Sequence, residues 1–151
     1  MQSPSRTEPH MKISAKTEYA CIAMLELSAR YAAEDLVRIR DIAEAHAIPS
    51  RFLVQILLQL KAAGLVESTR GASGGYRLAR SPEEITLADV VEVIDGPPVC
   101  EKPGDRVDPL CCALYSAWQQ ADRARGDQLA QIRFADLVEA AASDQLSMYY
   151  I

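Results

Sequence analysis

The hydrophobic pattern is clearest between residues 47 and 80, where it predicts a helix followed by a β-hairpin. The apolar stripe of the helix consists of Phe52, Leu53, Ile56, Leu57 and Leu60, at helical spacing. Ser50 can cap the start of this helix, and Gly64 is a residue type that commonly follows its end. Strand-like runs at 65–68 and 76–78 then flank a glycine-rich tip, which is typical of a hairpin.

Polar residues occupy a second face of the same predicted helix, with Arg51, Gln55 and Gln59 one turn apart. A short amphipathic helix at 38–46 precedes it, and residues 47–50 form the turn between the two. Two helices joined by a turn and followed by a hairpin are the layout of a winged helix-turn-helix, whose second helix enters the DNA major groove. A pair of helices in an ordinary core is the alternative, but it does not account for the hairpin.

Helical periodicity also marks segments outside this unit, at 14–31, 86–94, 113–131 and 134–142. A polar, proline-containing loop at 99–110 separates the second of these from the third. The length of this loop favours a functional role over a merely connecting one. The chain is therefore predicted to be mainly α, a winged helix-turn-helix with a small β-hairpin wing.

Charge is distributed unequally along the chain, which has a net charge of −5. Residues 11–80 contain 10 Lys and Arg against 7 Asp and Glu, whereas residues 81–151 contain 5 against 13. The positive half is thus the predicted DNA-binding half, where a phosphate-binding surface needs it. The acidic half should face away from the DNA.

The sequence argues against a membrane protein and against an enzyme. No apolar run approaches the roughly 20 residues that cross a bilayer, and residues 1–10 lack the apolar segment of a signal peptide. These features predict a cytoplasmic protein. The chain has only two histidines, His10 and His46, both expected to be solvated. It offers no nucleophile–base pair and no phosphate-binding loop after a strand.

Several polar side chains are candidates for contacts with a double-stranded DNA operator. Arg51 and Gln55 should reach base edges, since arginine pairs well with guanine and glutamine with adenine. Arg70, at the hairpin tip, should contact the minor groove or a phosphate. The other residues assigned to the DNA-binding surface are Ser50, Ser73, Lys16 and Arg40.

Three of the four cysteines frame the loop at 99–110: Cys100 opens it, and Cys111 and Cys112 close it. In the cytoplasm such cysteines favour metal ligation or redox chemistry over structural disulfides. Thiolates are the usual ligands of iron–sulfur clusters and of zinc, but the C-x10-C-C spacing lacks the C-x2-C pair of a zinc hairpin. Cys21 lies among apolar residues of the first helix and should be a buried, inert thiol.

Short motifs along the chain match a known pattern: Met11-Lys12-Ile13-Ser14, Thr17-Glu18-Tyr19-Ala20, Ile42-Ala43, Gly64-Leu65-Val66, Arg70-Gly71-x-x-Gly74-Gly75-Tyr76-Arg77-Leu78 and Ile85-Thr86-Leu87-x-Asp89-Val90-Val91. With them the sequence resembles the Rrf2 family of bacterial winged-helix transcription regulators, over about residues 11–141. The resemblance implies a homodimer in which the long helix at 113–131 packs against its copy and against the first helix. A helix folded back on its own domain is the alternative.

In the resembled family, three cysteines of the corresponding loop hold an iron–sulfur cluster. Cys100 and Cys112 match the first and last of them, Arg106 stands at the middle position, and Cys111 is an additional thiol. Tyr115 stands where IscR-like members have a histidine ligand. The pattern is closer to the redox-sensing RsrR type, so the resemblance implies a 2Fe–2S cluster as the first choice and a 4Fe–4S cluster as the second.

Some members of the family take an acidic cluster ligand from the first helix of the partner chain, and Glu18 stands at that position. The predicted metal ligands are therefore Cys100, Cys111, Cys112 and Glu18. A glutamate that interacts only with the dipole of its own helix is the alternative. Val54 stands where IscR-like members place a base-reading glutamate, so the operator should differ from theirs.

These features predict a DNA-binding transcription regulator, interpreted as a repressor, whose operator affinity is controlled by an iron–sulfur cluster. A metal-free repressor with a thiol–disulfide switch is the alternative. The predicted organisation is a disordered extension at 1–10, a winged-helix domain at 11–95, a cysteine-bearing loop at 96–112, dimerisation helices at 113–142 and a flexible tail at 143–151.

Overall fold

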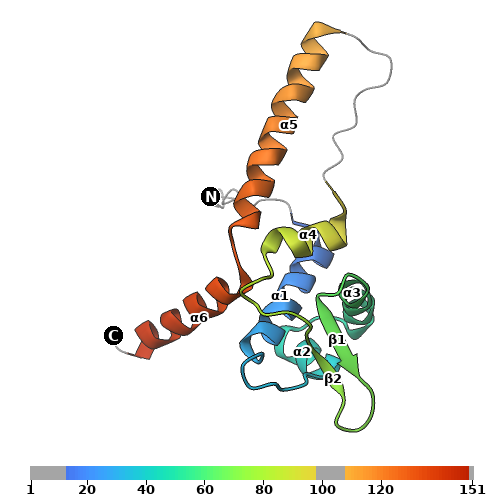
Figure 1. Ribbon diagram of the computed structural model, residues 1–151, viewed down its shortest axis with the longest axis vertical. Coiled ribbons are helices and arrows are strands. Elements are labelled where there is room, and N and C mark those ends of the chain that lie inside the picture. The colour runs from blue at the N-terminus through green and yellow to red at the C-terminus, as the bar shows by residue number, and fades with distance from the viewer. Residues whose placement is uncertain (1–12, 98–107, 150–151) are drawn as a thin grey trace, which may run out of the picture.

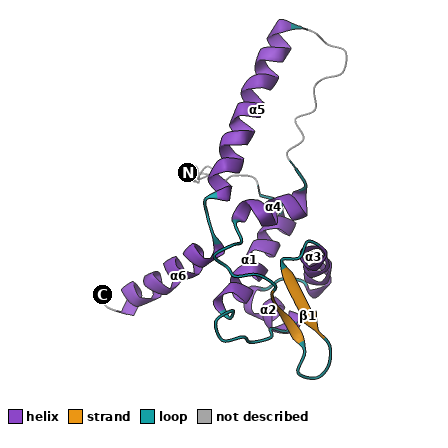
Figure 2. Cartoon of the chain, viewed as in Figure 1, coloured by secondary structure: helices purple, strands orange, loops and turns teal. Residues whose placement is uncertain are grey.

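The computed structural model describes residues 13–97 and 108–149 of the 151-residue chain, with side chains described as far as Asp144. The described residues form helices and one two-stranded antiparallel sheet, which confirms the predicted fold class (Figures 1 and 2). In these ranges, no helix is both long enough and apolar enough to cross a bilayer. The elements are α1 (Ala15–Ala29), α2 (Ile39–His46), α3 (Ser50–Ala62), β1 (Val66–Thr69), β2 (Gly75–Leu78), α4 (Leu87–Asp95), α5 (Pro109–Ala130) and α6 (Phe134–Tyr149).

One hydrophobic core joins α1, α2, α3, α4, the hairpin and the start of α6. The inward side of α3 contributes Leu53, Ile56, Leu57 and Leu60, each 0% exposed. These positions are spaced i, i+3, i+4 and i+7, so they share one side of a helix. The core therefore fixes α3 by one face and leaves the opposite face outward.

The start of α3 differs from its prediction, whereas its end agrees. Pro49, whose side chain has no acceptor, is the N-terminal cap, and Ser50 is already helical, so the prediction that Ser50 caps the helix is wrong. The reason is that the Pro49 carbonyl accepts the N–H of Leu53 at 3.2 Å, which includes Ser50 in the first turn. The predicted stop at Gly64 is confirmed: its φ is +78°, and its N–H donates to the Lys61 carbonyl at 3.0 Å.

The hairpin is attached to the helix-turn-helix through a close backbone contact. β1 and β2 pair in antiparallel register, with Thr69 opposite Gly75. A Cβ at Gly75 would lie only 2.8 Å from the carbonyl oxygen of Val37, so a larger residue does not fit there. This close approach lets Val37 and Tyr76 exchange two backbone hydrogen bonds of 2.8 Å. Because Val37 lies just before α2, the wing has a fixed position beside that helix.

The last two helices begin and end at other residues than the sequence predicts. Helices are predicted at 113–131 and 134–142, but α5 begins at Pro109 and α6 continues to Tyr149. The side chain of Asp108 accepts an N–H of the first turn of α5 at 3.1 Å, and proline suits the first helical position. The sequence thus contains a start signal for α5 that apolar periodicity does not reveal.

Figure 1 shows α5 extending away from the rest of the molecule. Its C-terminal half lies beside α4, and none of its residues is buried. The link to α6 returns the chain to the core, because the N–H of Leu87 donates to the Ile132 carbonyl at 2.9 Å and the N–H of Phe134 donates to the Ile85 carbonyl at 3.0 Å. Within the described part of the chain, α5 is therefore anchored only near its C-terminal end.

Candidate nucleic-acid interface

The outward face of α3 carries the side chains predicted to read DNA. Arg51 and Gln55 are both exposed, one helical turn apart. Val54 and Leu58 lie on the same face and are 40% and 55% exposed. Apolar groups on a recognition helix can contact the methyl group of thymine. Leu58 is not among the predicted residues, although its position three residues after Gln55 is a signal for the same face.

Phe52 lies at the edge of this outward face. It is 40% exposed, so its predicted place in the buried apolar stripe is wrong. One side of its ring is covered by Tyr19 of α1, with the ring centroids 6.5 Å apart. The guanidinium carbon of Arg51 lies 4.9 Å from the centroid of the same ring, a contact that the ring quadrupole favours. Phe52 thereby connects the position of Arg51 to α1.

The tip of the wing, residues 70–74, exposes Arg70 and Ser73 to solvent. The tip is also tied to the first helix of the helix-turn-helix, since the guanidinium of Arg38 donates a hydrogen bond to the carbonyl of Ala72. Arg38 is not among the predicted site residues. Its partner lies 34 residues later in the chain, so no local sequence signal connects the two.

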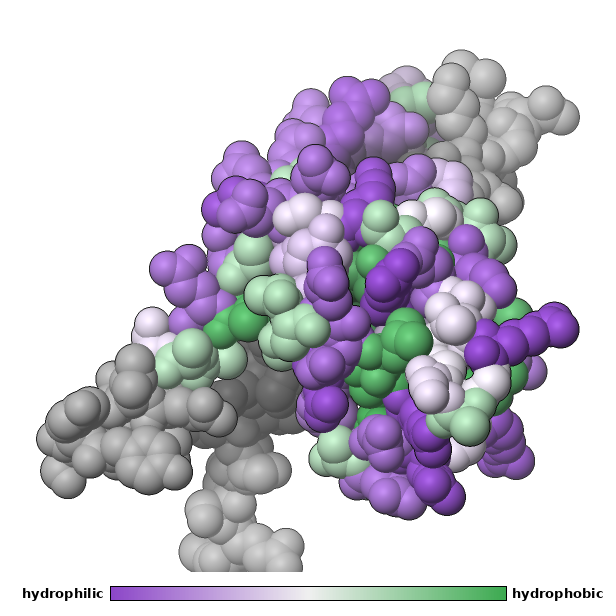
Figure 3. All heavy atoms as spheres, turned by 60° about the horizontal axis from the view of Figure 1, so that its bottom comes forward, coloured by the Kyte–Doolittle hydropathy of each residue, from purple (hydrophilic) through white to green (hydrophobic). Residues whose placement is uncertain are grey.

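The remaining predicted DNA contacts lie in the first turns of three helices. Ser50 and Arg40 are exposed in the first turns of α3 and α2, and Lys16 is half-buried in the first turn of α1. The contact between Tyr19 and Phe52 brings the first turns of α1 and α3 together. Seen with the wing turned forward, this side of the molecule is mostly hydrophilic, with a hydrophobic area in its middle (Figure 3).

Cys111 and Cys112 lie in the first turn of α5 rather than at the end of a loop, because Asp108 and Pro109 start the helix earlier than predicted. Cys111 is half-buried, and its thiol donates to Oδ2 of Asp108 at 3.5 Å. Cys112 is exposed, and its position is about 100° further around the helix. Two neighbouring helical residues therefore direct their sulfur atoms away from a single point.

The predicted metal ligands do not converge in one copy of the chain, as far as the structure describes it. Cys100 lies outside the described residues. Glu18 is exposed in the first turn of α1, on a different element from the cysteines. Among the described side chains, no group of three or more His, Cys, Asp or Glu residues could hold a metal ion.

Two titratable side chains of the scaffold have partners on distant elements. Burial raises the pKa of the Cys21 thiol to about 11, and the nearby Asp95 carboxylate adds to the shift. The thiol is therefore protonated at neutral pH, as an inert cysteine is, but Cys21 is half-buried rather than buried as predicted. His46 is exposed, as predicted, and its Nε2 also lies 2.7 Å from Oε1 of Glu26. That partner lies on α1, which the periodicity of one segment cannot reveal.

α5 presents apolar side chains that the described part of its own chain leaves uncovered. Leu110, Leu114 and Trp118 are 80%, 48% and 52% exposed. Their spacing of four residues places them along one side of the helix. The ring of Tyr115 packs edge-on against Trp118, with the centroids 5.5 Å apart. Contiguous exposed apolar groups of this kind mark interaction surfaces.

Known proteins with similar sequences and folds are transcription regulators. The profile of the Rrf2 family, described as an iron-dependent transcriptional regulator, matches residues 13–140. A putative HTH-type transcriptional regulator, rrf2-like, of Rhodobacter capsulatus is 38% identical over 123 residues, which cover 80% of this chain and 76% of that protein.

Two solved structures share the fold with a TM-score of 0.74 each. CymR, the global cysteine regulator of B. subtilis, is 33% identical, and the match covers 87% of this chain and 98% of CymR. The IscR of T. potens is 31% identical, and the match covers 89% of this chain and 91% of that protein. The chain therefore belongs to the Rrf2 family and is a winged-helix, DNA-binding transcription regulator rather than an enzyme.

Proposed function

We propose that this chain is a homodimeric transcription repressor of the cytoplasm whose affinity for its operator is controlled by Cys100, Cys111 and Cys112. The observation that carries the proposal is the position of two of these cysteines in the first turn of α5. That turn is also where the uncovered apolar side of the helix begins, at Leu110. A chemical change at the cysteines would therefore act directly on the surface through which two copies meet.

The winged-helix part supplies the DNA contacts in this proposal. Arg51 and Gln55 read base edges in the major groove, with Ser50 beside them and the apolar Val54 and Leu58 against thymine methyl groups. The wing contributes Arg70 and Ser73, while Lys16 and Arg40 bind phosphates. The helical residues of this set lie on elements that the core holds in place, and Arg70 and Ser73 lie at the tip of a hairpin whose strands belong to that core, which supports a preformed reading surface.

The apolar side of α5 supplies the contact between copies. Leu110, Leu114 and Trp118 lie along one side of this helix, and a second copy of α5 would cover them. A twofold dimer presents two copies of α3, and each copy binds one half-site of the operator. The centres of the two half-sites lie about 34 Å apart, which is one turn of the DNA helix. A shift of α5 relative to its copy would change that separation, and hence the operator affinity.

An iron–sulfur cluster is the first candidate for the controlling group, as a 2Fe–2S or, second, a 4Fe–4S centre. The ligands would be Cys100, Cys111 and Cys112 with Glu18 of the second copy. Because Cys111 and Cys112 diverge and Glu18 lies on another element, the described residues of one copy do not fit a cluster. A complete ligand set therefore requires Cys100 and the second copy. When bound, such a cluster would supply a redox-sensitive charge at the start of α5.

Metal-free thiol chemistry is the second candidate, and the geometry at α5 favours it specifically. Cys112 is exposed and therefore open to oxidants. By contrast, Cys111 and Cys112 could bind one cluster together only if the first turn of α5 changed its conformation. The solved relatives include both an IscR and the cysteine regulator CymR at the same TM-score, so the likeness in fold favours neither candidate over the other.

Purification without oxygen, with iron and sulfide analysis and a visible spectrum, tests the proposal. The variants are Cys112→Ser, Glu18→Ala and, as a matched control, Cys21→Ala, at a half-buried position on α1. A cluster predicts a coloured protein with about two iron atoms per chain, lost in Cys112→Ser, altered in Glu18→Ala and kept in Cys21→Ala. A thiol switch predicts a colourless protein whose operator affinity changes on oxidation, except in Cys112→Ser. A colourless protein whose operator affinity ignores oxidation would refute control by these cysteines.

A further inference from the structure

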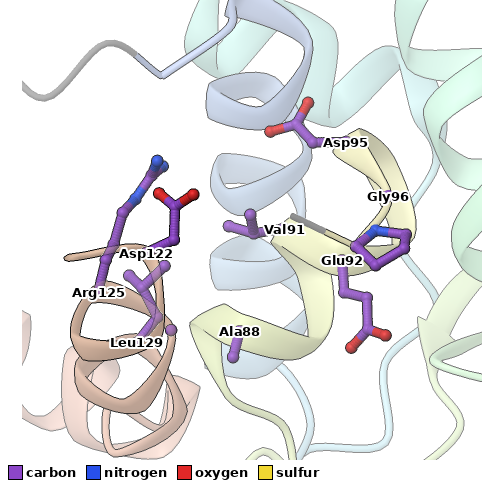
Figure 4. Close-up of a pocket in the computed structure, with 10 residues that line it drawn as sticks. Ala88, Val91, Glu92, Asp95, Gly96, Asp122, Arg125 and Leu129 are labelled. Atoms are coloured by element: carbon purple, nitrogen blue, oxygen red, sulfur yellow. The ribbon is translucent and has the colours of Figure 1, made fainter. Parts of the chain in front are cut away.

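A pocket of about 530 Å³ lies between α4 and α5, and Asp95 is one of its lining residues (Figure 4). Its floor is apolar, with Val91 and Leu129, and Arg125 of α5 lies on the wall opposite Asp95. Asp95 is the last residue of α4, so it stands where α4, α5 and α1 come together.

The Asp95 carboxylate holds the first turn of α1 by its hydroxyl groups. The hydroxyl of Thr17 donates to Oδ2 of Asp95 at 2.8 Å, and Thr17 is only 1% exposed. The hydroxyl of Ser14 lies 3.2 Å from Oδ1 of Asp95 and 2.9 Å from Oγ1 of Thr17, so its single proton can be given to either. Ser14 also accepts the N–H of Thr17 as the N-terminal cap of α1. One carboxylate thus completes the N-terminal cap of α1, whose cap residue Ser14 lies 81 residues earlier in the chain.

The helix dipoles explain why this contact matters more to α1 than to α4. A negative side chain at the C-terminal end of a helix meets the negative end of its dipole, which is unfavourable, whereas the N-terminal end of a helix favours it. Asp95 is unfavourable for α4 and favourable for α1. Its electrostatic effect continues along α1, since it contributes to the raised pKa of Cys21, one turn beyond Thr17.

The same first turns of α1 support the recognition helix. Two residues after Thr17, the ring of Tyr19 lies against Phe52 of α3, and Arg51 lies over Phe52. A continuous series of contacts therefore leads from Asp95 through Thr17 and Tyr19 to Phe52 and Arg51. We propose that Asp95 is a positioning residue for DNA recognition: it fixes the first turn of α1, and α1 fixes the orientation of Arg51 through Phe52.

This role also connects α5 with the DNA-binding surface. α5 carries Cys111 and Cys112 in its first turn and faces Asp95 across the pocket with Arg125 and Asp122. A displacement of α5 changes the charges around Asp95 and thus its hold on α1. The proposal rests on DNA binding by α3, which is part of the proposed function, but it does not depend on the chemistry at the cysteines.

Substitutions at Thr17 separate the hydroxyl contact from simple packing. Thr17→Val keeps the volume and loses the hydroxyl, whereas Thr17→Ser keeps the hydroxyl and loses a methyl group. A duplex selected from random DNA by the wild-type protein is the probe. Asp95→Asn and Thr17→Val should weaken binding by about fivefold or more, the lower end of typical couplings between sites. Thr17→Ser and the control Glu92→Gln, also on α4 and lining the pocket, should stay within about twofold of wild type.

A double-variant cycle tests whether Asp95 acts through Arg51. Asp95→Asn combined with Arg51→Ala should bind as Arg51→Ala does, because the positioned group is already absent. Additive losses, or a larger loss for Thr17→Ser than for Thr17→Val, would overturn the proposal.

The NMR signal of the Arg51 Nε–H in the free protein provides a second measurement that needs no DNA. It should shift in Asp95→Asn and Thr17→Val and keep its wild-type position in Thr17→Ser and Glu92→Gln. An unchanged signal in all four variants would overturn the positioning role. A wild-type protein that selects no duplex, but shows the expected NMR shifts, would refute the proposed function and leave the positioning role supported.

Discussion

α3 and α5 are both helices with an apolar side, but among the described residues only α3 has that side packed in the core of its own chain. Leu57 and its three neighbours on the inward face of α3 are fully buried, whereas α5 has no buried residue and its Leu110 is 80% exposed. α3 is therefore held by the core on one face and exposes its other, largely polar face. α5 instead exposes its apolar face, and none of its own residues is buried. In the proposed function, the DNA-reading half is therefore complete in one copy of the chain, while the cysteine-bearing half needs the surface of a second copy.

The largest expected difference between the two helices is in their contribution to folding. Leu57→Ala should lower the free energy of unfolding by about 2–5 kcal/mol, because it leaves a cavity in a closed core. The control Leu114→Ala, at a position 48% exposed, should change it by less than about 0.5 kcal/mol in dilute protein. Chemical denaturation followed by circular dichroism measures both. Equal losses in the two variants would show that α5 is packed within a single copy.

Association of the two copies should depend on α5 alone. Trp118→Ala should raise the dimer dissociation constant about thirtyfold, equivalent to the 2 kcal/mol of an interface hot spot, since a large exposed aromatic side chain loses its partner surface. Sedimentation at several concentrations gives this constant, and Arg123→Ala, exposed on the same helix, is the control. A dimer equally stable in Trp118→Ala would place the contact between copies elsewhere.

Specific DNA recognition should depend on the outward face of α3. Arg51→Ala should weaken binding to the selected duplex about tenfold and relax the preference for one base pair, as loss of a bidentate base contact does. Arg30→Ala, at the C-terminal end of α1, is the control. Competition binding with duplexes changed at single positions measures both effects. If Arg51→Ala retained the full sequence preference, α3 would have to read DNA with other side chains.

The smallest expected effect is at the wing. Arg70→Ala should weaken binding to all duplexes alike and lower the slope of log affinity against log salt by about one, because one phosphate contact is lost. Arg77→Ala is a matched control, since Arg77 lies on β2 of the same hairpin and pairs with Glu67. A salt titration of both variants decides. Identical slopes for wild type and Arg70→Ala would exclude a phosphate contact by Arg70.

The winged-helix half follows closely from its sequence because its signals are local. The spacing of Leu53, Ile56, Leu57 and Leu60 is enough to orient α3, and a glycine at 64 is enough to end it. Phe52 departs from this rule because it stands at the border of the stripe, where Tyr19 covers only one side of the ring. The early start of α5 also has a local signal, in Asp108 and Pro109, but this is a capping signal rather than apolar periodicity.

The sequence alone determined the helix-turn-helix, the wing and the outward direction of Arg51 and Gln55, because each depends on residues within one or two helical turns. Only the tertiary structure decided which distant side chains meet. Arg38 holds the wing tip across 34 residues, and Asp95 holds the start of α1 across 78. Such contacts depend on how the helices pack in three dimensions, and the free energy that selects the packing is shared by the whole core rather than recorded in any one segment.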